Sequence, residues 1–257
     1  MGRSFQIVED KIEEAEFFLD KLRFEDTNSV QFKFKTAYFY VSAFLSATRS
    51  ITFCLQASLN DSSDFQEWHL RQQEKLKRSE LAQFFTQARN LSQKVGYYPL
   101  SGARVKPEEN GSHRVELYFD RVNEENLKYI PETDVLTACT MHFKQLLDII
   151  IDCYKHFGKI IDPEKYYTIE NMMEKGMTIE DFENELGFEE GWTQAEGLSL
   201  DDRVGLVRDQ APKITIDWIF VKYLGTDRYG TPVDEDWKKY VGTTGCEELL
   251  ERLAKEP

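Results

Sequence analysis

The first part of the chain carries apolar residues at helical spacing. Within residues 5–24 one stripe recurs at steps of three and four: Val8, Ile12, Ala15, Leu19 and Leu22. Residues at these steps share one face of a helix, so the pattern predicts an amphipathic helix with its acidic residues on the other face. Turn-forming residues after Phe24 predict the end of this helix.

Residues 31–59 form a longer pattern that contains no Gly or Pro and is apolar on more than one face. Such a segment predicts a central, mostly buried helix. Ser42, Ser46 and Ser50 recur every four residues and would let a neighbouring helix come close, either from the same chain or across a dimer axis. Arg49 lies in this helix and would need an acidic or carbonyl partner if buried.

A third helical pattern covers residues 64–96, with a break expected near 70–78 and an end at Gly96. Residues 97–122 then predict an inserted β-hairpin, because alternating apolar residues follow an Asn-Gly turn within 107–112. Helical spacing returns in 132–158, where Gly158 is expected to stop the helix.

The rest of the chain predicts short helices. Asp162-Pro163 suits a helix start, and Thr178 with Asp181 suits a capping box. Residues 200–209 also look helical, and 245–255 predict a final amphipathic helix. Residues 213–224 are ambiguous, but their β-branched and aromatic content favours a strand.

These elements predict a mainly α fold. Residues 1–158 would form an antiparallel helical bundle with the hairpin inserted at about 97–122. Residues 159–257 would form a small, acidic C-terminal α or α+β region. We place the boundary near residue 160, where both the charge and the helix length change.

The charge is distributed unevenly along the chain. The net charge of −14 argues against a non-specific binder of nucleic acid or of an anionic membrane. Residues 160–257 hold 11 basic and 23 acidic residues, whereas 69–106 hold eight basic residues and only two acidic ones. A basic strip therefore precedes an acidic last third, which would be a solvated surface, cover the strip, or dock a protein partner.

Other chemical classes find little support. The four cysteines form no CxxC pair, and Cys139 with His142 lacks a second ligand pair, so we expect neither a disulfide framework nor a metal site. No nucleotide-binding or hydrolase motif suggests a cofactor. The acidic N-terminus is unlike a signal peptide, and the apolar runs are too short to span a membrane, so we expect a soluble, cytoplasmic protein.

One short motif suggests a function. Arg89 and Asn90 lie late in the third helix, with Lys94 beyond them. With this helix order, the pair resembles the HEPN superfamily, whose members are helical bundles that often dimerise. Its active members are metal-independent ribonucleases, found in bacterial defence and toxin–antitoxin systems, with a motif of Arg, often Asn, and a following His. The resemblance implies a homodimer and Arg89, Asn90 and Lys94 as catalytic candidates.

Lys94 stands where the motif His would be in the shortest spacing. A histidine side chain has an ordinary pKa of about 6.5 and can accept and donate protons at neutral pH. A lysine side chain has an ordinary pKa of about 10.4, so it is protonated and a poor base. The resemblance thus leaves open an endoribonuclease, a degenerate phosphate-binding site, and a role of Arg89 and Asn90 only within the bundle. We expect nearby residues to contact RNA phosphates or bases: Arg71, Lys75, Lys77, Arg78, Tyr97, Tyr98, Arg104 and Lys106. The competing hypothesis is a non-catalytic dimeric interaction or scaffold protein.

Overall fold

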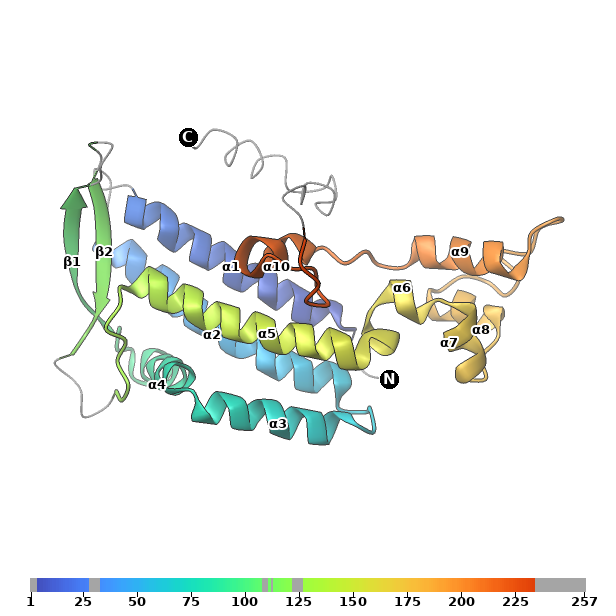
Figure 1. Cartoon of the computed structure of the whole chain (residues 1–257), viewed down its shortest axis with the longest axis horizontal. Helices are drawn as coiled ribbons and strands as arrows, with labels where there is room; N and C mark the ends of the chain where they lie inside the picture. Colours follow the sequence, from blue (N-terminus) through green and yellow to red (C-terminus); the bar gives the residue numbers. More distant parts are fainter. Residues whose placement is uncertain (1–3, 28–32, 108–110, 112, 122–126, 234–257) are drawn as a thin grey trace. The chain divides into compact units, whose positions relative to one another are not determined.

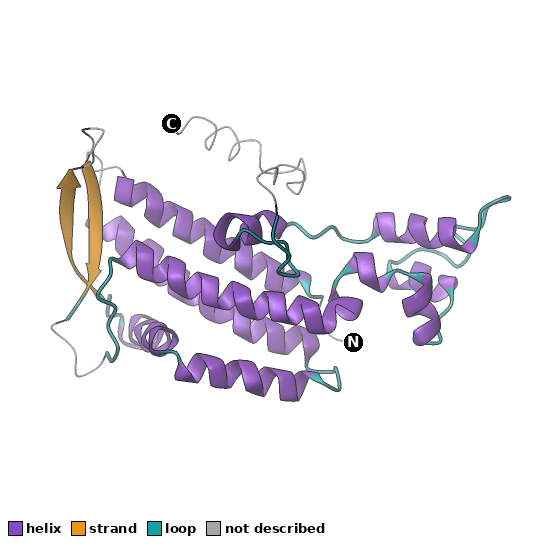
Figure 2. Ribbon diagram, in the orientation of Figure 1, coloured by secondary structure: helices purple, strands orange, loops and turns teal. Residues whose placement is uncertain are grey.

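The computed structural model describes residues 4–27, 33–107, 111, 113–121 and 127–233. In this part of the chain the fold is mainly helical with one antiparallel hairpin, as predicted (Figures 1 and 2). The chain divides into two compact units, Met1–Ile149 and Ile150–Pro257. This division lies inside the long helix α5 (Val135–Ile161), earlier in the chain than the change in charge near residue 160.

The first unit is built on two long helices, α1 (Gln6–Thr27) and α2 (Phe34–Leu59), which pack against each other in antiparallel directions (Figure 1). The predicted apolar stripe of α1 is buried along its length. The helix continues beyond Phe24 to Thr27, so the turn residues do not end it as expected. Burial of the stripe against α2 stabilises the pair by removing apolar surface from water.

The third predicted helix is two helices, α3 (Phe65–Arg78) and α4 (Glu80–Val95). Ser79 separates them in an extended conformation, and its hydroxyl accepts a hydrogen bond from the amide of Ala82. The serine thus ends one helix and caps the next, just beyond the predicted break. Figure 1 shows α4 nearly end on, so it crosses α3 steeply. Gly96 ends α4 in the left-handed conformation, as predicted.

The predicted hairpin is confirmed, with β1 (Leu100–Pro107) pairing antiparallel to β2 (His113–Phe119). The ring of Phe119 meets the edge of Phe84 on α4 with 4.7 Å between centroids. The hairpin is therefore fixed to α4 by aromatic packing.

The interior of the first unit is aromatic. The ring of Phe44 on α2 lies 6.2 Å from Phe85 on α4 and 6.4 Å from Phe143 on α5, both in edge-on geometry. All three side chains are buried. This contact joins the N-terminal half of α5 to α2 and α4 and positions the candidate site on α4.

The second unit contains five further helices in the described residues: α6 (Pro163–Tyr166), α7 (Ile169–Glu174), α8 (Ile179–Glu185), α9 (Leu200–Gln210) and α10 (Asp217–Leu224). The predicted cap at Asp162 and the capping box of Thr178 with Asp181 are both confirmed. One core cluster joins α7, α8 and α9: Tyr167, Met172, Ile179, Phe182, Val204, Val207 and Ala211.

The predicted strand at 213–224 is wrong, because its last eight residues are α10. Ile219, Phe220 and Tyr223 are buried at helical spacing, and Gly225 ends the helix in the left-handed conformation. The described residues offer this segment no neighbouring strand. Burial of one helical face therefore outweighs the β-propensity of the side chains. The helix expected at 245–255 lies outside the described residues.

Gly158 does not stop α5, which continues to Ile161. A methyl group at this glycine would lie 2.9 Å from the hydroxyl oxygen of Tyr229. That hydroxyl donates a hydrogen bond of 2.5 Å to the buried carboxylate of Asp162. The glycine thus provides room for the tyrosine and does not terminate the helix.

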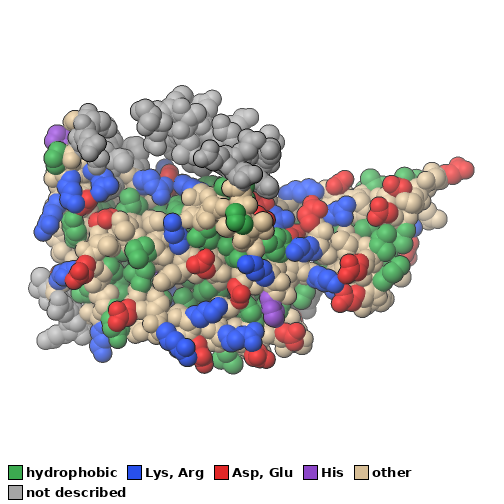
Figure 3. Space-filling model, in the orientation of Figure 1, with side chains coloured by type: hydrophobic (Ala, Val, Ile, Leu, Met, Phe, Trp, Pro, Cys, Tyr) green, Lys and Arg blue, Asp and Glu red, His purple; other side chains and the backbone are tan. Residues whose placement is uncertain are grey.

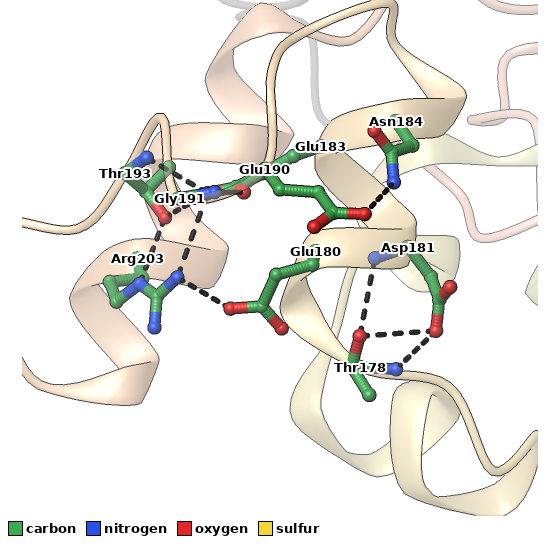
Figure 4. Close-up of polar contacts among 9 residues, drawn as sticks. All are labelled: Thr178, Glu180, Asp181, Glu183, Asn184, Glu190, Gly191, Thr193 and Arg203. Carbon is green, nitrogen blue, oxygen red and sulfur yellow. Dashed lines mark hydrogen bonds and ion pairs between the residues drawn. The ribbon is translucent and has the colours of Figure 1, made fainter.

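A buried carboxylate holds the loop after α8 in the second unit (Figure 4). Glu183 is fully buried and accepts hydrogen bonds from the amides of Gly191 and Thr193 at 2.6 and 2.8 Å. The Thr193 hydroxyl adds a third bond of 2.5 Å, and Arg203 lies 3.6 Å from the same carboxylate. Burial alone would raise the pKa of Glu183, but these bonds outweigh it and lower the pKa.

Candidate functional site

Helix α4 places Arg89 at the edge of the buried surface. Phe85 and Ala88 on the same helix are buried, whereas Arg89 and Asn90 are half-buried. The Arg89 Nη1 atom donates a hydrogen bond of 3.3 Å to Asn90 Oδ1. The Arg89 Nε atom is buried and has no hydrogen-bond partner among the described residues. Arg89 therefore keeps unused donor capacity in a poorly solvated position.

A second arginine, Arg49 on α2, lies near enough to Arg89 for the two positive charges to interact. Burial lowers the pKa of Arg49, and the positive charge of Arg89 lowers it further. The Arg49 side chain donates a hydrogen bond of 3.3 Å to the Thr52 hydroxyl and lies 4.4 Å from the centre of the Phe53 ring. Within the described part of the chain, neither arginine forms an ion pair with a carboxylate. The acidic or carbonyl partner expected for Arg49 is absent from these contacts.

Lys94 lies exposed on the last turn of α4. Helical geometry places it about 7.5 Å along the axis from Arg89 and about 140° around it. Asn90 and Lys94, four residues apart, share a face instead. The helix thus brings Arg89 to Asn90 and Asn90 to the side of Lys94, but it does not direct Arg89 and Lys94 to one point.

The periodic serines of α2 contact α4 of the same chain. The hydroxyl oxygens of Ser42 and Ser92 are 2.8 Å apart, and the side-chain amide of Gln93 donates a hydrogen bond of 2.9 Å to Ser46 Oγ. Both contacts are made on α4 just after Arg89 and Asn90. They fix the position of the Arg-Asn pair relative to α2.

Several cations of the predicted basic strip already contact acidic or aromatic side chains. Arg71 is 2.8 Å from Glu67, Arg78 is 3.6 Å from Glu74, and Lys106 is 2.7 Å from Glu116. The Arg104 guanidinium lies 5.1 Å from the centre of the Tyr118 ring. Burial raises the pKa of the Asp148 carboxyl, and the positive charge of nearby Lys75 opposes this increase. Figure 3 shows basic side chains over α3 and the hairpin with acidic side chains between them.

The two predicted stacking residues, Tyr97 and Tyr98, join the hairpin to the helices. The Tyr97 hydroxyl donates a hydrogen bond to Asp120 at the end of β2. The Tyr98 ring stacks on Tyr38 of α2, with 5.2 Å between centroids and 10° between planes. One face of Tyr98 is therefore occupied within the chain, although 37% of the residue is exposed.

The two buried histidines each stack on a phenylalanine ring. Burial lowers the pKa of His69, whose ring stacks on Phe65. Burial also lowers the pKa of His142 to about 4, against a weaker opposing effect of Gln145, and this ring stacks on Phe85. Neither histidine is hydrogen-bonded to Arg89 or Asn90 in the described structure. No group of three or more His, Cys, Asp or Glu residues among those described could hold a metal ion.

The fold defines a mainly helical protein with an inserted hairpin, and the comparisons add one similarity. Residues 25–105 match the family model described as bacteriophage lambda protein ea47. This stretch contains Arg49, Arg89, Asn90 and Lys94. Searches of curated proteins and of solved structures each gave no match. In the described residues, no helix has both the length and the apolar character that a membrane crossing needs.

Proposed function

We propose that the first unit is a HEPN-like bundle that binds RNA through its phosphates. The observation that carries this proposal is the pair Arg49 and Arg89, two half-buried cations on neighbouring helices with no carboxylate partner in the described structure. Like charges in a poorly solvated place repel each other, so an anion between them would be stabilised from both sides.

The donor geometry favours a phosphate. A guanidinium group presents a planar fork of N–H donors that matches two oxygens of a phosphate. In the described structure Arg49 donates one hydrogen bond and Arg89 donates one, which leaves both with further N–H groups. Asn90 beside Arg89 can direct that side chain, and the exposed Lys94 adds positive charge for the next phosphate along a strand.

The same geometry favours binding over cleavage. A metal-free ribonuclease needs a group that removes the 2′-OH proton at neutral pH. The position of the motif histidine holds Lys94, and a lysine side chain is ordinarily protonated at neutral pH and so a poor base. His69 and His142 are buried and form no hydrogen bond to Arg89 or Asn90 in the described structure. We therefore propose RNA recognition without turnover, in the defence or toxin–antitoxin setting that the HEPN resemblance implies.

The test is RNA binding by the full chain. We would measure the affinity of a fluorescent single-stranded RNA at several salt concentrations for the wild type, R89A/K94A and R49A. Each lost phosphate contact should reduce the slope of log affinity against log salt by about 0.7. R71A is the matched control, because Arg71 is already paired with Glu67 on the exposed side of α3. It should change the affinity least.

Two results would contradict the proposal. Equal RNA affinity in the wild type and R89A/K94A would show that these side chains do not contact the strand. Metal-independent cleavage that disappears in R89A would show an active nuclease instead of a binding protein. If the wild type binds no RNA but sediments as a concentration-dependent dimer, the scaffold hypothesis replaces the RNA hypothesis.

A further inference from the structure

A cavity of about 350 Å³ lies in the first unit where α3 and α4 meet α2 and α5. Figure 1 shows α3 and α4 joined at an angle alongside these two helices. Small-molecule sites usually measure roughly 300–1,000 Å³, so this cavity has the size of one compact ligand. Its position is distinct from the Arg89 and Asn90 pair, which does not line it.

The cavity wall contains cations but no carboxylate. Arg49 and Lys77 both line it, and none of its lining residues is Asp or Glu. Lys77 is exposed and forms no ion pair among the described residues, unlike Arg71 and Arg78 on the same helix. Ala82 and Gln83, in the first turn of α4, line the same wall, and the start of a helix carries partial positive charge. The wall therefore attracts an anion.

The available hydrogen-bond donors point to the same conclusion. The Gln87 amide oxygen is occupied, because it accepts a bond of 2.7 Å from the backbone amide of Lys128. Its NH₂ group is left for the cavity. By contrast, the hydroxyl protons of Thr48, Thr52 and Thr86 all go to backbone carbonyls of their own helices. The donors available in the wall therefore include Arg49, Lys77 and Gln87, together with the side-chain amide of Gln73.

The inner wall is apolar and contains one unsatisfied polar atom. Leu45, Leu146 and Phe85 line it, together with His142, which is 7% exposed and stacks on Phe85 at 4.3 Å. The His142 Nδ1 atom is buried without a hydrogen-bond partner among the described residues. A flat ligand can pack on this apolar wall. The buried Nδ1 atom has almost no accessible surface, so it is not a ligand contact in this arrangement.

We propose that this cavity binds a nucleoside phosphate, with its phosphate at Arg49 and Lys77 and its base against the apolar wall beside His142. The wall selects a ligand with an anionic group at one end and a flat ring at the other. Thr86 is exposed at the edge of the cavity, so a ligand can enter from solvent. The site goes beyond the proposed RNA function and shares only Arg49 with it.

Calorimetry on the full chain would test the proposal with three probes: nucleoside 5′-monophosphates, inorganic phosphate, and a short 5′-phosphorylated RNA. We expect saturable binding of a free monophosphate and weaker binding of phosphate. K77Q should weaken both by about tenfold or more, the effect of one lost charged hydrogen bond. R71Q, the matched change on the exposed side of α3, should not weaken either. The RNA probe is read in R89A/K94A, which lacks the proposed RNA contacts outside the cavity. Tighter binding of the RNA than of every monophosphate in that variant would assign the cavity to a strand end and overturn the free-nucleotide source.

Two variants separate the ends of the ligand. H142A removes the aromatic ring beside Phe85 from the apolar wall, so it should weaken the monophosphate and leave inorganic phosphate unchanged. T86E adds a negative charge at an exposed position and should abolish both, which keeps the test decisive if H142A does not fold. No saturable binding of any probe, or equal weakening by K77Q and R71Q, would overturn the proposal. R89A/K94A should leave monophosphate binding intact, so this site and the RNA function can fail separately.

Discussion

The hydroxyl groups of Ser42 on α2 and Ser92 on α4 lie 2.8 Å apart. Because a serine side chain is short, two serines on different helices can reach each other only where the helix backbones lie close together. The periodic serines of α2 therefore serve contact within one chain at this point. The same contact holds α4 where Arg89 lies near Arg49.

Substitution of Ser42 by leucine should lower the free energy of unfolding by about 1–3 kcal/mol, the usual effect of overpacking. S42A removes only the hydrogen bond and should cost about 1 kcal/mol. Chemical denaturation of both variants checks the order. A leucine variant as stable as S42A would show that α2 and α4 are not in close contact. Because α4 carries Arg89, S42L should also weaken RNA binding.

Glu116 predicts a pH dependence of the hairpin. This buried carboxylate on β2 is bonded to Lys106, Tyr118 and Arg114. Burial alone would raise the pKa of Glu116, but these bonds lower it to about 2. The folded pKa is below the unfolded one, so the stabilisation is fully present above about pH 4.5 and is lost as the pH falls toward 2.

Substitution E116Q tests this dependence. At neutral pH the variant should be less stable than the wild type, and the difference should shrink as the pH falls from about 4.5 toward about 2. Hydrogen exchange of hairpin amides at several pH values would measure it. A difference that stays constant through this range would show that the charge of Glu116 does not stabilise the hairpin.

Glu183 should be the most sensitive carboxylate of α8. In E183Q the amide NH₂ would face the N–H donors of Gly191 and Thr193, so about 2 kcal/mol or more of stability should be lost. Glu180 on the same helix is the matched control. It is half-exposed and paired with Arg203, and E180Q should cost about 0–1 kcal/mol. Faster exchange of the amides at 188–193 in E183Q alone would support this difference, and equal exchange in both variants would contradict it.

Two helical glycines should respond oppositely to alanine. G205A in α9 meets no atom within 4 Å and should gain up to about 1 kcal/mol from helix propensity. G158A in α5 meets Tyr229, whose hydroxyl is held by buried Asp162, and should lose stability. Thermal unfolding of the two variants compares the signs. A gain in both would mean that Tyr229 moves away easily.

Short-range patterns predicted much of this fold. The α1 stripe, the alternation of β2, Gly96 and the caps at Asp162 and Thr178 each depend on residues a few positions apart. The errors occur where distant residues decide. The apolar residues at 213–224 fit the repeat of a strand as well as that of a helix. Burial of one helical face in the folded unit selects the helix. From the sequence, Gly158 is expected to end the helix. In the structure the glycine makes room for Tyr229, a residue far along the chain.

The candidate site was predictable only in part. The sequence identifies Arg89 and Asn90 as neighbours on one helix, and it marks Arg49 as a cation that needs a partner. It does not show that Arg49 and Arg89 lie near each other, because this depends on how α4 packs on α2. Likewise, Lys77 and His142 lie far apart in sequence, and only the folded helices bring them to one cavity.

The division of the chain inside α5 has a practical consequence for experiments on its parts. A fragment that stops at Ile149 would cut a continuous helix in two and leave its last hydrogen-bonded turns without a continuation. The second unit alone would keep Tyr154 and its contacts with Phe220 and Tyr229 but would lose the preceding turns of the same helix. Each fragment therefore needs its own copy of α5, and limited proteolysis of the folded chain should not cut within this helix.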